Sequence, residues 1–179
     1  GDNANFMKQA VPFGFYKALT VYTYLLGDAL PMKPLGKSVP EGIWGNVPSY
    51  VPWLLDETPM GKRFYAEFKK RIGHPAPSYM APAAYDETYV LKYAIEKAKS
   101  FEPKDIAKAM ENMTGDYILG KVTIREIDHQ AMVPVIVGRT VWDEGLGYMA
   151  IKRDTKVLWP DKYPDLYHSP EEIKKLRGG

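Results

Sequence analysis

Residues 84–98 read AYDETYVLKYAIEKA, and this stretch decides the fold. The apolar side chains of Tyr85, Tyr89 and Tyr93 or Ala94 recur at the spacing of one helix face. The charged residues between them fall mostly on the opposite face. The pattern therefore predicts a helix over about residues 82–99 that buries one side against the rest of the protein.

Two further helices flank this stretch. Residues 60–72 carry apolar side chains four positions apart and are followed by Gly73, a typical helix stop. A shorter helix is predicted over 103–113, with Pro103 in its first turn, where proline is tolerated. The middle of the chain is thus helical.

The beginning of the chain mixes a helix with a strand. An apolar helical pattern runs over residues 3–18 with Asp2 or Asn3 as a plausible N-cap, but Pro12 should end or kink the helix near Val11. Residues 19–26, LTVYTYLL, are β-branched and aromatic and predict a buried strand.

The end of the chain is predicted to be mostly strands. These strands are expected at 117–127, 132–142 and 148–152. A further short strand is predicted earlier in the chain, near 42–45. Ser169-Pro170-Glu171-Glu172 has the order of an N-cap, a first-turn proline and an acidic first turn, and predicts a short final helix. Helices alternating with strands indicate the α/β class.

Bulk composition excludes several classes of function. The 179 residues carry 24 basic and 22 acidic groups, a net charge of +2, so no electrostatic feature favours nucleic acid as a partner. There is no cysteine, which excludes disulfides and thiolate zinc sites. No stretch approaches the 18 apolar residues expected of a membrane-spanning helix.

Several motifs together resemble the type I periplasmic solute-binding proteins, in the Leu/Ile/Val-binding branch that also takes aromatic acids. They are AYDETYVL (84–91), AIEKA (94–98), IAKAME (106–111), GKVTIR (120–125), DHQ (128–130) and FMKQA (6–10). Each motif is only moderately specific, and their order and spacing carry the resemblance, which spans about residues 1–142.

The resemblance implies a fold of two parallel-sheet lobes with flanking helices, of which the N-terminal half is expected to be absent here. Residues 1–45 would be part of the second lobe, and 46–59 an interlobe crossing. Residues 60–127 would be part of the first lobe, and 128–179 would hold recrossing strands and the C-terminal tail. Either the chain was cleaved from a longer one, or an N-terminal partner chain supplies the rest.

Four candidate ligand-binding residues follow from the strand ends, because ligands of open α/β sheets lie at the carboxyl ends of strands. Asp2 and Asn3 precede the first helix, and Asp28 and Ala29 follow the first strand. An acid at such a position could hold an ammonium or a hydroxyl, and a helix amino end could hold a carboxylate. The alternative is that both acids only cap helices or turns.

Trp44 and Tyr50 are further ligand candidates, because they lie in or near the proline-rich crossing and aromatic walls suit small-molecule pockets. For each of these aromatics, and for Trp53 beside them, lobe packing is the favoured alternative.

No enzyme is predicted. His74, His129 and His168 lack metal-like spacing, and His129 beside Asp128 has no nucleophile partner. We therefore expect no catalytic residue, no metal site and no cofactor.

The resemblance instead implies an extracytoplasmic receptor on the periplasmic or outer face of the membrane. It would close on a small solute by a hinge and deliver it to the membrane permease of an ABC importer. The alternatives left open are an interaction module that reuses half of this fold with a partner chain and, less favoured, a hydrolase.

Overall fold

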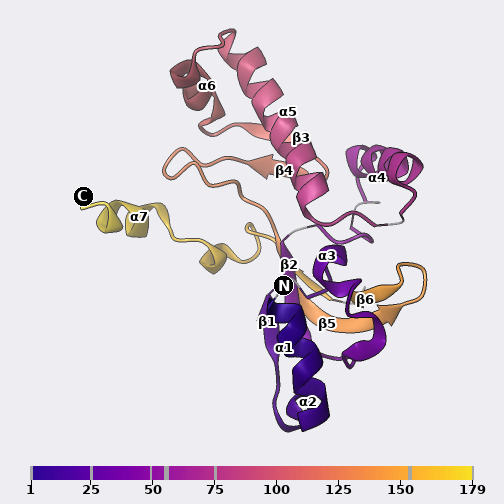
Figure 1. Cartoon of the computed structure of the whole chain (residues 1–179). Coiled ribbons are helices and arrows are strands. Elements are labelled where there is room, and N and C mark those ends of the chain that lie inside the picture. Colours follow the sequence, from indigo (N-terminus) through magenta and orange to yellow (C-terminus); the bar gives the residue numbers. More distant parts are fainter. Residues whose placement is uncertain are drawn as a thin grey trace.

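A computed structural model describes residues 2–24, 26–48, 50–54, 57–74, 76–152 and 155–178. It has two parts (Figure 1). One is a mixed sheet with the first helices of the chain, here called the sheet unit. The other holds the middle helices and a β-hairpin, here called the helical unit. The α/β class predicted from the sequence is confirmed.

The helices have these bounds: α1 Asp2–Ala10, η1 Val11–Phe13, α2 Phe15–Ala18, α3 Ala29–Met32, η2 Gly36–Ser38, α4 Pro59–Ile72, α5 Met80–Ala98, α6 Pro103–Met110, η3 Pro164–Leu166 and α7 Pro170–Leu176. As predicted, Gly73 ends α4 in the left-handed region, at φ 71°. Thr58 caps the start of α4 by accepting a hydrogen bond from the Gly61 N–H.

The first helix ends where Pro12 predicts it. The chain tightens into the 3₁₀ turn η1 after Ala10 and then reverses at Gly14, whose φ is 67°. The N-cap prediction is wrong for both Asp2 and Asn3, because α1 already begins at Asp2.

The strands are β1 Tyr22–Tyr24, β2 Trp44–Pro48, β3 Thr114–Tyr117, β4 Gly120–Thr123, β5 Val135–Asp143, β6 Tyr148–Ile151 and β7 Lys156–Leu158. The main sheet has the order β1-β2-β5-β6, and β7 also pairs with β5. Among the strands of the described residues, only β1 and β2 pair in parallel, and β5 runs antiparallel to β2, β6 and β7. The expected parallel sheet is therefore corrected to a mixed one.

The two faces of this sheet differ in burial. The covered face carries Thr23, Gly45, Val47, Ile136 and Gly138, and all but Thr23 are buried. The open face carries Tyr22, Tyr24, Trp44, Val137 and Arg139. The prediction that residues 19–26 form a buried strand is wrong, because β1 has only three residues and exposes 57% of Tyr22 and 56% of Tyr24.

The helical unit is built around α5. α6 packs along it, and the β3–β4 hairpin lies beside its middle (Figure 1). The expected strand over 117–127 is corrected to a hairpin that turns between Tyr117 and Gly120. A shared core joins the two units, because Val47 and Ile136 of the sheet pack in one cluster with Tyr117 and Val122 of the hairpin.

Among the described residues, no helix combines the length and apolar character needed to cross a membrane.

Candidate functional site

The amino end of α1 lies beside β1. The Asn3 Nδ2 donates to the Thr23 Oγ1 at 3.4 Å, which places the first turn of α1 next to the middle of the strand. Figure 1 shows α1 and β1 side by side, connected through α2 at the end away from Asn3, so α1 runs antiparallel to β1, as the helix of a β-α-β unit does. Asn3 thus lies on the covered side of the sheet, toward the carboxyl end of β1, where a ligand of an α/β sheet is expected.

Asp28 joins the two units just beyond that end. Its carboxylate caps α3 by accepting from the Leu30 N–H at 2.9 Å, and its other oxygen accepts from the Tyr79 N–H at 2.7 Å. The residue is only 3% exposed, and Ala29 next to it is 6% exposed. Each oxygen of Asp28 thus has a backbone partner, so the capping alternative describes its contacts.

Gly27 is required at this turn. Its φ is 98°, and an added Cβ would lie 2.9 Å from the Ile151 backbone nitrogen. The chain therefore passes tightly between β6 and the start of α3, which fixes the position of Asp28.

Tyr50 follows the carboxyl end of β2 and binds a second buried carboxylate. Its hydroxyl donates to the Asp86 Oδ2 at 2.8 Å, and the Asp86 Oδ1 accepts from the Ile118 N–H at 2.9 Å. Burial raises the pKa of Asp86 to about 6, against the opposing effect of these two hydrogen bonds. Burial, with the Asp86 charge second, also raises the pKa of Tyr50.

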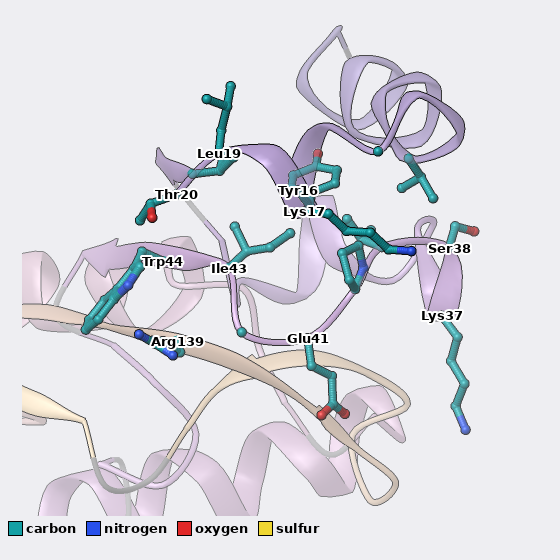
Figure 2. A pocket seen from close by; sticks show the side chains of 16 residues that line it. Tyr16, Lys17, Leu19, Thr20, Lys37, Ser38, Glu41, Ile43, Trp44 and Arg139 are labelled. Carbon is teal, nitrogen blue, oxygen red and sulfur yellow. The ribbon is translucent and has the colours of Figure 1, made fainter.

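Trp44 lies away from these residues. It pairs with Tyr22 at the amino end of β2, and the Arg139 guanidinium stacks 4.8 Å from the centre of its ring. The two side chains line one wall of a hollow of about 480 Å³ at the amino end of β1, shown in Figure 2. Lys17 and Glu41 lie along the rest of it.

The structure therefore brings Asn3, Asp28, Ala29 and Tyr50 to the carboxyl ends of β1 and β2 and leaves Trp44 at the other end. Asp2 occupies the first turn of α1. The hollow of Figure 2 lies at the end of the strands that ligands of open sheets do not use.

Sequence reasoning missed the role of Asp86. Asp86 lies in a motif whose apolar pattern predicts the helix α5. That pattern does not predict that Asp86 is buried or what it contacts. Sequence reasoning also missed the buried Asn46 Oδ1 and Ser78 Oγ, which have no hydrogen-bond partner among the described residues. Asn46 follows two residues after Trp44 in β2, and Ser78 directly precedes Tyr79, the partner of Asp28. Only strand register could have pointed to Asn46.

No cluster of three or more metal-binding side chains is found in the described part of the chain.

An α/β chain with polar groups gathered at strand ends is typical of proteins that bind small molecules. A family model described as "Periplasmic binding protein" matches residues 1–145. The chain therefore belongs to the periplasmic binding protein family.

Individual relatives agree with this assignment. The chain is 37% identical over 78 residues to Leu/Ile/Val-binding protein homolog 4 of Brucella abortus, a match that covers 41% of this chain and 18% of the relative. A leucine-binding protein from Thermotoga maritima is 26% identical over 88% of this chain and 42% of its own, with a TM-score of 0.67.

A periplasmic binding protein from Burkholderia mallei shares the fold at 17% identity and a TM-score of 0.75, over 96% of this chain and 44% of its own. The chain thus spans less than half the length of the proteins it matches. These relatives are named as binding proteins, not as enzymes.

Proposed function

We propose that this chain is part of an extracytoplasmic solute receptor of an ABC importer and forms one wall of its binding site. The solute is a small organic molecule such as an amino acid or an aromatic acid. It is held between two lobes that close by a hinge, and the closed receptor docks on the membrane permease.

The observation that carries the proposal is the meeting of polar groups at the carboxyl end of β1. Asn3 bonds to Thr23, one residue before that end, and Asp28, four residues after it, joins the sheet unit to Tyr79 of the helical unit. This is the place where the two units face each other and where α/β folds bind ligands. The family match and the leucine-binding relative support the same reading.

Within this site we assign different roles to the candidates. Asn3 and Ala29 would contact the solute. Asp28 would act as a positioning residue, because its oxygens are already bonded to backbone N–H groups. Tyr50 would hold the crossing in place through Asp86. Asp2 would add negative charge at the rim, and Trp44 would lie outside the solute contacts.

The missing N-terminal half or a companion chain is part of the proposal, because this chain spans less than half the length of the solved relatives. The open face supports it, since Tyr22 and Tyr24 expose more than half of their surface and β1 is the last strand of its sheet. The same observation favours the second candidate function, an interaction module completed by a partner chain without a solute.

Native mass spectrometry with added solutes separates the two. The first function predicts a complex of this chain with a companion of domain size that gains mass when leucine or 4-hydroxybenzoate is added. A complex that never takes up a solute across a broad panel of organic acids and amino acids would favour the interaction module. A folded, monodisperse chain alone that ignores both would contradict the two functions together.

A further inference from the structure

The C-terminal tail, residues 159–178, starts in one unit and ends on the other. It follows β7, which pairs with β5 through Val135–Leu158 and Ile136–Val157 and so belongs to the sheet unit. From there it runs to the level of the helical unit and ends in α7 (Figure 1). Its path is therefore a third connection between the units, beside the two chain segments that link β2 to α4 and β4 to β5.

The far end of the tail is bonded to one loop of the helical unit, residues 124–133. The Tyr167 hydroxyl donates to the Val133 O at 2.8 Å, and the Arg177 Nη1 donates to the Ile127 O at 2.6 Å. In return, the Arg125 Nη1 donates to the His168 O at 2.8 Å and stacks on the Tyr167 ring.

This loop is fixed to the helical unit. Ile124 is buried in a cluster with Ala94 of α5 and Met113, and the Asn112 Nδ2 donates to the Glu126 carboxylate at 2.8 Å. A contact with this loop is therefore a contact with the helical unit itself.

The tail is also shaped to hold its end in place. Ser169 and Glu172 form a reciprocal capping box that fixes the start of α7, and Ile173 is buried. One short helix later, Arg177 arrives at the Ile127 carbonyl. The short capped helix α7 thus sets the distance between Tyr167 and Arg177, the two residues of the tail that donate hydrogen bonds to the loop.

Polar contacts, more than close packing, make this attachment. A hollow of about 680 Å³ remains between the tail and the loop, lined by side chains such as Asp128, Met132 and Pro164. These contacts are individual hydrogen bonds, each weak on its own. A few such bonds hold a segment in place and still break when the units are driven apart.

From this geometry we propose that the tail is a strap that ties the helical unit to the sheet unit and limits their relative rotation. The two units already share core residues, such as Ile136 and Tyr117, and the tail adds a tie outside that core. A tie far from the shared core limits rotation about it. The inference concerns the two units of this chain and stands whether or not a solute binds between them.

The absence of cysteine in the chain makes the test direct, because two introduced cysteines are the only labelling sites. Lys17 in α2 and Lys104 in α6 are exposed and lie in different units. Spin labels on Lys17→Cys and Lys104→Cys report the distance between the units by pulsed electron resonance.

We expect one narrow distance distribution for the full chain. Truncation after Trp159 should broaden it or add a second distance, and Tyr167→Phe combined with Arg177→Ala should have a smaller effect in the same direction. Lys175→Ala, an exposed change in α7, is the matched control and should leave the distribution unchanged.

If the truncated chain fails to fold by circular dichroism, the Tyr167→Phe/Arg177→Ala variant carries the test alone. An unchanged distribution in that variant would overturn the proposal. So would equal broadening in the Lys175→Ala control, because the effect would then not pass through the bonds to the loop.

Discussion

The two faces of the main sheet are made from alternate residues of the same strands, yet they have opposite surroundings. Ile136 on the covered face is fully buried, whereas its neighbour Val137 on the open face is only partly buried. A period-two strand pattern decides which residues share a face, but not what lies against that face. What covers each face therefore has to be learned from structure and from binding.

The largest expected effect is on the covered face. Ile136→Ala should lower the free energy of unfolding by about 3 kcal/mol, because it leaves a cavity in the core shared by both units. Val137→Ala on the open face should cost less than about 1 kcal/mol. Urea denaturation of both variants checks this, and equal losses would contradict the difference between the faces.

A tight contact on the covered face gives the next effect. In Gly45→Ala the new Cβ would lie 2.4 Å from the Leu26 Cβ and 2.9 Å from the Thr23 carbonyl oxygen. We expect a loss of about 1–3 kcal/mol from overpacking, measured by thermal and urea unfolding.

The control for this change is Gly145→Ala, where the nearest atom is the Asp143 Oδ1 at 3.3 Å. It should change stability by less than about 0.5 kcal/mol. A harmless Gly45→Ala would mean that the strand sits further from Leu26 than described.

Helix ends could be predicted from the sequence, whereas burial and long-range contacts could not. Pro12, Gly73 and the capping residues Ser169 and Glu172 determine helix ends through contacts with their own neighbours in the chain, so these ends can be predicted. The burial of β1 could not be predicted, because an aromatic run has the same sequence pattern whether or not another layer covers it. The contacts of Asp28 and Asp86 were not readable either, because their partners Tyr79 and Ile118 lie 51 and 32 residues away.

Asp86 should make the stability of the chain depend on pH. It is buried between Tyr50, which follows β2 of the sheet, and Ile118 of the helical unit. Burial raises its pKa from 3.8 to about 6. Between these values the unfolded chain has released the proton that the folded chain keeps. The free energy of unfolding should therefore fall as pH rises from about 4 to about 6 and level off above.

Asp86→Asn keeps the size of the side chain and removes this titration. The pH profile of the wild-type chain minus that of the variant, from urea melts at several pH values, isolates the effect. A difference that rises with pH through this window would show that Asp86 is ionised and stabilised in the fold, against our expectation.

The smallest effect is expected on the open face. Tyr22→Thr with Tyr24→Thr keeps residues that favour strands and should change the stability of the chain alone by less than about 0.5 kcal/mol. The same pair should weaken any complex with a companion polypeptide at least tenfold, measured by titration calorimetry. Phe101→Thr, a change at an 84% exposed side chain in the helical unit, is the control.

The central claim is that a solute binds at the carboxyl end of β1, between the two units. Amide hydrogen exchange on the complex of this chain with its companion, with and without bound solute, tests it most directly. We predict added protection at residues 2–5 and 26–30. Protection confined to the hollow around Trp44 and Arg139, with none at the carboxyl end of β1, would contradict the account.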